Sequence, residues 1–241
     1  MTDIFKGKIA IVTGGTSGIG YALSEELLRR GAIVWVIGSR EQSVAVAKKS
    51  LASYPGARFA AVDVTVGDQV MGMIDTCVSE CGRLDYLFNN AGIGMTHPST
   101  KLTLDMWKKA IDLNLWGVIY GVHYALPVML AQGSGHIVNT SSVAGIIAPP
   151  SQAVYCATKY AVTGMTEALR YEFLERASCS QRSARPMSRL RSSARPISPG
   201  RPSQPMKRHG LFSKVWRRRR TSSSSRSMQR RCTSASWLTR G

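Results

Sequence analysis

The distribution of acidic residues divides this chain of 241 residues into two parts that cannot fold by the same rules. All 14 Asp and Glu residues lie at or before Glu175, where 15 of the 32 Lys and Arg residues nearly balance them. The 65 residues after Arg176 carry the other 17 basic groups and no acidic group. We therefore predict a folded domain over residues 1–176 and a separate basic segment over residues 177–241.

The basic segment is dominated by Arg, Ser and Pro and has few aliphatic side chains. Such a composition buries too little apolar surface to offset the entropy of ordering, so we expect this segment to be disordered. Two interpretations stay open: a frame-shifted translation, and a genuine tail that binds RNA, DNA or an acidic surface. We favour the frame shift, because dropping two bases at Arg176 allows the reading GVVLSAVCPADVATP, an apolar run followed by a proline turn.

The first 176 residues alternate short apolar runs with longer segments of helical periodicity, which is typical of a parallel sheet covered on both faces. The runs are rich in Val, Ile and Ala and do not alternate with polar residues, as in strands buried on both sides. The predicted strands are Lys8–Thr13, Ile33–Ile37, Arg58–Val62, Leu84–Asn89 and His136–Thr140, and the predicted helices are Ile19–Arg30, Gln42–Ser53, Asp68–Cys81, Leu104–Leu130 and Gln152–Arg176. This pattern predicts an α/β fold, a doubly wound parallel sheet of Rossmann type that stops after the fifth strand and its following helix.

A glycine-rich turn, TGGTSGIG, joins the first predicted strand to the first predicted helix. Gly14 permits a tight turn, Gly18 lets the backbone approach a phosphate, and Gly20 allows close packing of helix on strand. The helix N-terminus then offers free N–H groups and a positive dipole end to a pyrophosphate. The predicted cofactor contacts in this turn are Gly14, Thr16, Ser17, Gly18, Ile19 and Gly20.

Further motifs follow in order along the predicted elements: Asp63-Val64, Asn89-Asn90-Ala91-Gly92, Asn114, Ser142 and Tyr155-Cys156-Ala157-Thr158-Lys159. With these motifs, the TGxxxGxG turn and the separation of 13 positions from Ser142 to Tyr155, residues 5–176 resemble the short-chain dehydrogenase/reductase family. The resemblance implies an oxidoreductase that transfers a hydride between NADP(H) or NAD(H) and an alcohol or carbonyl group. It also implies that Asp63 and Val64 contact the adenine ring, and that the cofactor floor is formed by Asn90, Ala91 and Gly92.

The resemblance implies a catalytic set of four residues, Asn114, Ser142, Tyr155 and Lys159. Tyr155 and Lys159 are four apart on a helix and project from one face. A nearby ammonium group favours phenolate and lowers a tyrosine pKa from about 10, which suits Tyr155 to general acid–base catalysis. By the same resemblance, Ser142 hydrogen-bonds the reacting oxygen, Lys159 also holds the nicotinamide ribose, and Asn114 positions a water that relays protons.

The end of the second predicted strand bears on the choice between NADP and NAD. Where NAD-preferring relatives carry Asp, this chain has Gly38, followed by Ser39 and Arg40. A carboxylate there grips the ribose hydroxyls and repels a 2′-phosphate, whereas a guanidinium suits a phosphate. We therefore predict that Ser39 and Arg40 contact the cofactor and that NADP is preferred. The alternative is that Arg40 simply ends the strand in solvent.

Composition excludes some other classes. The five cysteines lack metal-ligand spacing, which predicts no metal site and structural thiols in a reducing, cytoplasmic setting. No apolar run approaches the roughly 20 residues of a membrane span, so we expect no membrane partner. The expected partners are a small alcohol or carbonyl substrate and, as in the family, a second copy in a homodimer or tetramer. Nucleic acid is expected only if the basic tail is genuine, in which case the competing function is a Rossmann-domain scaffold.

The family pattern continues beyond the last predicted helix with a sixth strand, a Pro-Gly turn and a substrate loop, none of which is visible after Arg176. Their loss leaves the fifth strand as an unpaired edge. We therefore expect this chain to bind cofactor poorly and to show little or no activity. The run IIAPP at residues 146–150 predicts an apolar wall on the substrate side.

Overall fold

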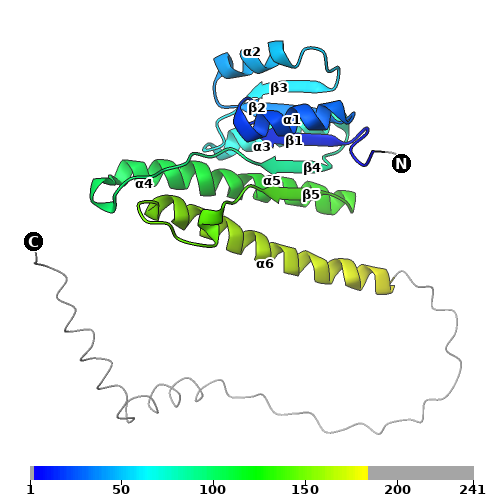
Figure 1. Ribbon diagram of the computed structural model, residues 1–241. Coiled ribbons are helices and arrows are strands. Elements are labelled where there is room, and N and C mark those ends of the chain that lie inside the picture. The colour runs from blue at the N-terminus through cyan, green and yellow to red at the C-terminus, as the bar shows by residue number, and fades with distance from the viewer. Residues whose placement is uncertain (1–2, 184–241) are drawn as a thin grey trace, which may run out of the picture. The chain divides into compact units, whose positions relative to one another are not determined.

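The computed structural model describes residues 3–183, with side chains for residues 3–173. Its centre is a five-stranded sheet in the order β3-β2-β1-β4-β5, in which every neighbouring pair is parallel (Figure 1). The strands are β1 Ile9–Thr13, β2 Ile33–Gly38, β3 Ala57–Ala61, β4 Tyr86–Asn89 and β5 His136–Asn139. The predicted doubly wound α/β fold is confirmed. The basic residues 184–241, and with them the expectation of disorder, lie outside the described residues.

Helices connect the strands throughout the described chain. They are α1 Gly18–Arg29, α2 Glu41–Ser50, α3 Gly67–Cys81, α4 Leu104–Ile111, α5 Gly117–Gln132 and α6 Ala153–Ser183. Three shorter helical turns are η1 Ser99–Lys101, η2 Asp112–Trp116 and η3 Val143–Gly145, of which η2 is a π-turn. Each strand end therefore leads into a helix or turn at the same edge of the sheet, where α/β proteins form their ligand sites.

Alternating side chains of the buried strands point to two separate cores. On one face, Ile11 of β1 and Ile37 of β2 pack with α3 and α5 in a cluster that includes Ile74 and Ala125. On the other face, Val12 and Val34 pack with α1 and α2. The two faces explain why the strand sequences are apolar without alternation, since both sides of β1 and β2 are covered.

The helices α5 and α6 pack together beside the sheet through a third apolar cluster, centred on Val118, Val122 and Val162. By length and composition alone, Leu104–Gln132 is apolar enough to cross a membrane. In the structure, however, α5 buries Val118, Val122 and Met129 against the sheet and against α6. Its apolar character is therefore accounted for by packing inside the domain.

Two helices differ most from the predicted boundaries, while the others agree to within three residues at each end. The single helix predicted over Leu104–Leu130 is divided by the π-turn η2, because the side chain of Asn114 bonds the neighbouring backbone instead of facing solvent. The last helix does not stop at Arg176 but runs to Ser183, seven residues into the segment that we expected to be disordered. No Pro or Gly interrupts residues 177–183, and the first helix-breaking residue beyond them is Pro186.

The outer part of the sheet is covered on one face only. Tyr86 and Phe88 of β4 pair in register with His136 and Val138 of β5, on the face where α1 covers β1. No helix within residues 3–183 lies over β4 and β5 on that side (Figure 1). The rings of Tyr86 and Phe88 stack with centroids 6.0 Å apart, and the Phe5 ring lies 5.2 Å from that of Tyr86. This set of Phe5, Tyr86, Phe88, His136 and Val138 is called the open face below.

Candidate functional site

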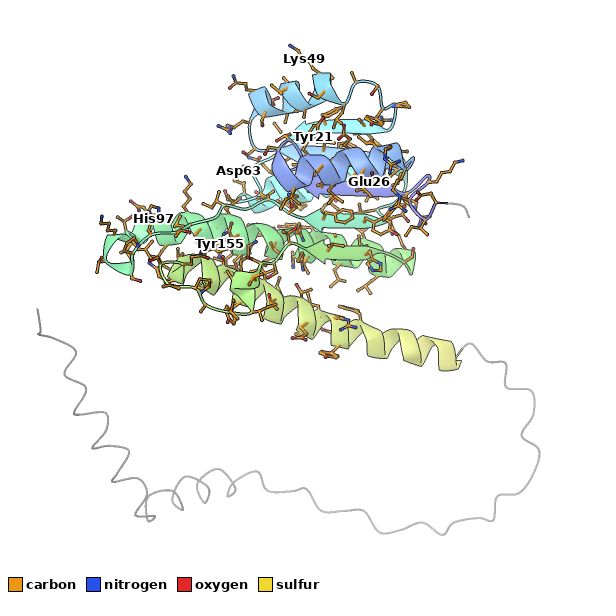
Figure 2. The ribbon with its side chains drawn as sticks, viewed as in Figure 1. Tyr21, Glu26, Lys49, Asp63, His97 and Tyr155 are labelled. Carbon is orange, nitrogen blue, oxygen red and sulfur yellow. The ribbon has the colours of Figure 1, made fainter. Side chains whose placement is uncertain are left out.

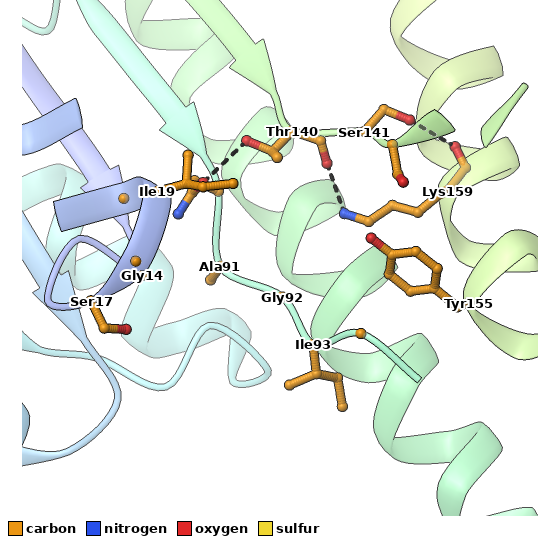
Figure 3. A pocket seen from close by; sticks show the side chains of 15 residues that line it. Gly14, Ser17, Ile19, Ala91, Gly92, Ile93, Thr140, Ser141, Tyr155 and Lys159 are labelled. Carbon is orange, nitrogen blue, oxygen red and sulfur yellow. Dashed lines mark hydrogen bonds between the residues drawn. The ribbon is translucent and has the colours of Figure 1, made fainter. Parts of the chain in front are cut away.

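A cavity of about 430 Å³ opens where β1, β4 and β5 end and α1 and α6 begin (Figure 3). Its walls come from the glycine-rich turn, the segment after β4, the segment after β5 and the first turns of α6. The lining residues are Gly14, Ser17, Gly18, Ile19, Gly20, Asn90, Ala91, Gly92, Ile93, Gly94, Thr140, Ser141, Ser142, Tyr155 and Lys159. Eleven of these are predicted site residues, so the structure brings most of the predicted site into one cavity.

The glycine-rich turn forms a wall made largely of backbone. Gly14 and Gly18 have φ angles of +64° and +54°, which side-chain-bearing residues rarely adopt. A Cβ atom on Gly20 would lie 2.2 Å from the carbonyl oxygen of Gly14, so only glycine allows α1 to start this close to the turn. Ser17 precedes α1 without capping it by its side chain. The first N–H groups of α1 are therefore left for a ligand in the cavity, where the helix dipole favours an anion.

Thr13 and Asn90 fasten this turn to the end of β4. The buried Thr13 hydroxyl accepts hydrogen bonds from the N–H groups of Asn90, at 2.9 Å, and of Ala91, at 3.0 Å. The Asn90 side-chain amide donates to the carbonyl oxygen of Thr13 at 3.1 Å, and its oxygen accepts from the Thr140 hydroxyl at 3.4 Å. Asn90 thus joins three strand ends around the cavity, a role that its position after β4 alone does not reveal.

Ser142 is held in a tight turn with its hydroxyl on the cavity. It is the N-terminal cap of η3, and its Oγ accepts from the N–H of Ala144 at 3.2 Å. This leaves its hydroxyl proton free for a ligand. Ser141 points the other way: its Oγ lies 2.6 Å from Oγ1 of Thr163 and donates to the carbonyl oxygen of Lys159 at 3.3 Å. The geometry therefore favours Ser142 over Ser141 as the reactive hydroxyl, in agreement with the 13-residue spacing.

Tyr155 and Lys159 occupy successive turns of α6 and face the same cavity (Figures 2 and 3). The Lys159 side chain is buried, with its residue 4% exposed, and its Nζ lies 5.8 Å from the centre of the Tyr155 ring. Nζ donates to the carbonyl oxygen of Thr140 at 2.7 Å. Burial lowers the pKa of Lys159 below its ordinary value. The amine and phenol are thus positioned to share a proton with a ligand.

Asn114 is fully buried at the centre of the π-turn, beside the cavity but not on its wall. Its Oδ1 accepts from the N–H of Ile93 at 2.8 Å, and its Nδ2 donates to the Ile93 carbonyl at 2.9 Å and to the Thr158 hydroxyl at 3.4 Å. These bonds fix the segment after β4 against α6. Since π-turns occur frequently at functional sites, the interruption of the helix here is itself a positional signal.

The remaining predicted residues lie beyond the cavity lining. Ser39 and Arg40 are exposed at the end of β2, where Arg40 caps α2. Thr16 adjoins Gly38: a Cβ at Gly38 would lie 2.7 Å from Thr16 Cγ2, so this end of β2 has no free space for a side chain. The last two are Asp63, whose Oδ1 accepts from the N–H and hydroxyl of Thr65, and Val64, which is buried against Gly117.

Sequence reasoning missed four residues of the lining: Ile93, Gly94, Thr140 and Ser141. Thr140 matters most, because its carbonyl holds Lys159 and its hydroxyl holds Asn90. The signal that could have found these residues is position: Thr140 ends a predicted strand and Ser141 follows it, while Ile93 and Gly94 come next after the predicted site residue Gly92. Backbone groups carry no residue-type signature, so a carbonyl contact of this kind cannot be predicted from residue identity.

The charge and donor set limit what the cavity can hold. No Asp or Glu lines it, and within residues 3–183 no group of three or more His, Cys, Asp or Glu residues could hold a metal ion. Burial raises the pKa of the Cys77 thiol, away from the cavity, to about 12, so this thiol is unreactive at neutral pH. A wall of glycine backbone, an uncapped helix N-terminus and one buried lysine fit an anionic dinucleotide whose pyrophosphate approaches α1 closely.

Comparison with known proteins agrees with this geometry. The short chain dehydrogenase family matches residues 8–177. An uncharacterized oxidoreductase of Staphylococcus saprophyticus is 40% identical over 167 residues, which make up 69% of this chain and 68% of that protein. Among solved structures, ElxO with NADP bound has a TM-score of 0.67 at 33% identity, covering 70% of this chain and 69% of ElxO. NAD⁺-bound xylitol dehydrogenase has a TM-score of 0.68 at 30% identity, covering 71% and 67%. The chain therefore belongs to the short chain dehydrogenase family of oxidoreductases.

Proposed function

We propose that the cavity is the active site of an NADP-preferring alcohol dehydrogenase or carbonyl reductase. The observation that carries the proposal is the convergence of Ser142, Tyr155 and Lys159 on one cavity whose opposite wall is the glycine-rich turn. A dinucleotide held at that wall supplies or accepts the hydride. The remaining chemistry belongs to the protein, which must bind the reacting oxygen and move a proton.

Tyr155 is the proposed proton donor for reduction and acceptor for oxidation. Its phenol lies on the cavity with the buried amine of Lys159 one turn away. A positive charge at Lys159 attracts the phosphates of a dinucleotide, and its N–H groups can donate to the ribose hydroxyls. Ser142 donates its free hydroxyl proton to the reacting oxygen, which stabilises the charge that develops there.

Asn114 has a different role from the one implied by family resemblance. The side-chain oxygen of Asn114 accepts a hydrogen bond from the N–H of Ile93. Its side-chain nitrogen donates to the carbonyl oxygen of Ile93 and to the hydroxyl of Thr158. We assign it a positioning role: it sets the segment after β4, which lines the cavity, at a fixed distance from the Tyr155 helix. A water in the proton relay would then be held by the backbone that Asn114 fixes.

The substrate side of the site supports a neutral, apolar alcohol or ketone. Beyond Ser142, the large side chains of Val143, Ile146 and Ile147 are exposed, at 66%, 72% and 58%. Tyr160 of α6 donates from its hydroxyl to the Ile146 carbonyl and holds this apolar segment next to Tyr155. Among the described residues no acidic side chain lines the cavity and its one lysine is assigned to the cofactor, so this part of the chain offers no charged group to a charged substrate.

The preference for NADP rests on the end of β2. Ser39 and Arg40 are exposed there, directly after Gly38, which adjoins the Thr16 side chain of the glycine-rich turn. Guanidinium and hydroxyl groups suit a 2′-phosphate. In addition, a Cβ at position 38 would lie 2.7 Å from Thr16 and 3.1 Å from the Ser43 hydroxyl. The Asp found here in NAD-preferring relatives would therefore require the Thr16 side chain to move.

The test is the substitution Tyr155→Phe. Hydride transfer from NADPH to an apolar cyclic ketone is measured by the loss of NADPH absorbance. We expect turnover to fall by at least 10³-fold, within the range typical of a lost proton donor combined with lost charge stabilisation, while NADPH affinity stays within about twofold. The assay is run on this chain and on a chimera that continues α6 with the C-terminal part of a full-length relative, because we expect the chain itself to turn over slowly. Unchanged turnover in both backgrounds would remove Tyr155 from the mechanism.

The competing function, a scaffold with a nucleic-acid-binding tail, depends on residues that lie beyond Ser183 and outside the described structure. No contact of the described residues favours it. Translating the coding DNA in all three frames across Glu175–Ser178 separates the two: a frame shift predicts a second frame that stays open with ordinary acidic content. If neither alternative frame stays open, the tail is genuine, and salt-sensitive nucleic-acid binding is the next measurement.

A further inference from the structure

Lys159 has an unusual environment for a lysine. Within residues 3–173 it is the only buried lysine, and its Nζ makes one hydrogen bond, to the Thr140 carbonyl at 2.7 Å. No carboxylate lines the cavity to hold its charge. Lys108 is the opposite case: it is exposed, and Asp112 at 2.5 Å raises its pKa. Burial without an acidic partner lowers the pKa of Lys159, so more of its amine is neutral and nucleophilic at a given pH.

We propose that Lys159 is a carbonyl-capture site, which binds small aldehydes covalently as an imine when no dinucleotide fills the cavity. The neutral Nζ attacks the carbonyl carbon, and a proton from nitrogen passes to the oxygen to give a carbinolamine. The C–O bond then breaks, and the oxygen leaves as water after taking a proton from the Tyr155 hydroxyl. The nitrogen forms the C=N bond and returns its remaining proton to the Tyr155 oxygen. One amine and one aldehyde give one imine and one water, with no change of oxidation state. The step does not depend on the hydride transfer proposed above.

The groups around Lys159 suit both halves of this reaction. The cavity of about 430 Å³ adjoins the amine, so a molecule of a few carbon atoms can reach it and the released water can leave. Tyr155 and Ser142 line the same cavity and carry hydroxyl protons. Ser142 holds the incoming carbonyl oxygen, since its proton is not used within the protein. Tyr155 protonates the departing hydroxyl, which is the slow step of imine formation at neutral pH for a neutral amine.

Capture and cofactor binding exclude each other, because both use Lys159 and the adjoining space. An aldehyde that is the product of alcohol oxidation would therefore inactivate the free enzyme reversibly, whereas the cofactor-bound enzyme would be protected. The extent of Lys159 modification would therefore depend on the cofactor concentration: the lysine is modified when aldehyde is present and dinucleotide is scarce.

The experiment treats the full chain at pH 7 with propanal and sodium cyanoborohydride, which reduces an imine to a stable propyl-lysine, and maps the label by mass spectrometry. We expect early labelling of Lys159 to exceed that of Lys108 by at least tenfold. The preference should disappear when the chain is unfolded in guanidinium, and Tyr155→Phe should slow labelling of Lys159 without affecting Lys108. Lys108→Arg is the matched control and should leave the Lys159 label unchanged.

Labelling of Lys159 at or below the level of Lys108 in the folded chain would overturn the proposal. Preincubation with NADP⁺ separates it from the proposed function. Suppression of the Lys159 label by NADP⁺ supports both imine capture and the proposed cofactor site. Strong labelling that NADP⁺ does not suppress supports imine capture and counts against the cofactor site. Because the comparison is made between two lysines of the unmodified chain, it does not depend on a variant that folds.

Discussion

Ser141 and Ser142 are adjacent residues with the same side chain, yet the fold gives their hydroxyl groups different hydrogen-bond partners. The spacing to Tyr155 predicts Ser142, and both serines line the cavity, but only the Ser142 hydroxyl has its proton unused within the protein. The partner of Ser141 could not be predicted, since Thr163 reaches it only after α6 has packed against the end of β5. Residue types that perform chemistry were thus visible in the sequence. The residues that hold them in place, such as Thr140, Thr158 and Thr163, were not, because their contacts are tertiary.

At this scale the cofactor preference is testable through Arg40. Arg40→Ala should weaken NADPH binding by about 1–2 kcal/mol, the typical contribution of a charge-assisted contact, and leave NADH binding unchanged. Isothermal titration with both cofactors measures the difference. Lys49→Ala is the matched control, since it removes one positive charge from the far end of the same helix, α2 (Figure 2).

Equal effects of these two substitutions would mean that Arg40 acts only through net charge.

A second prediction, for the opposite cofactor preference, follows from the crowding at Gly38. Gly38→Asp alone should bind either cofactor poorly, because its Cβ has no room beside Thr16, whereas Gly38→Asp with Thr16→Ala should favour NADH. A single Gly38→Asp substitution that switches preference without loss of affinity would contradict the packing described here.

At the scale of elements, the order and type of every strand were predictable, because buried parallel strands are apolar runs separated by helical patterns. The interruption of the long helix before α5 was not. Asn114 carries no helix-breaking signal, and η2 forms because the amide of Asn114 bonds the backbone of Ile93 in another segment. The end of α6 was also placed wrongly, since charge composition changes at residue 176 while helix-forming geometry continues to Ser183.

Two glycines show how an element's environment decides the effect of one methyl group. In Gly20→Ala the new Cβ would lie 2.2 Å from the Gly14 carbonyl, so the glycine-rich turn must shift, and we expect loss of NADPH binding together with lower thermal stability. Gly72 lies inside α3 with nothing within 4 Å of its Cβ position. Gly72→Ala should therefore stabilise the domain by about 0.5–1 kcal/mol. Chemical denaturation and cofactor titration of both variants check the contrast, which fails if the two behave alike.

At the scale of the molecule, the described domain has an asymmetric sheet. β3 is the edge strand on one side of the sheet, and β5 is the edge strand on the other. The open face, which includes Tyr86, Phe88 and Val138, lies on the β5 side. Edge strands and exposed apolar faces promote association between chains. The sequence predicts this edge, and within residues 3–183 β4 is the one strand that pairs with β5.

We expect the chain to self-associate through the open face. Val138→Lys places a charge on this face and should lower the associated fraction in analytical ultracentrifugation by several-fold. Val46→Lys on the outside of α2, where the valine is 60% exposed, is the control and should leave association unchanged. If both lysines reduce association equally, net charge rather than the open face is responsible.

The strand order also determines when each strand can pair with its neighbours during synthesis of the chain. β1 lies at the centre of the sheet and pairs with β2 and β4, but β4 begins at Tyr86, long after β1 has left the ribosome. At about 5–20 residues per second, β1 waits on the order of 4–15 s for its second neighbour. During that interval the nascent chain holds at most the β3-β2-β1 half, with the backbone of Ile11 and Val12 unpaired on one side. The centre of the finished sheet is therefore the edge of the unfinished one, and this nascent edge is where a ribosome-associated chaperone would bind to most effect.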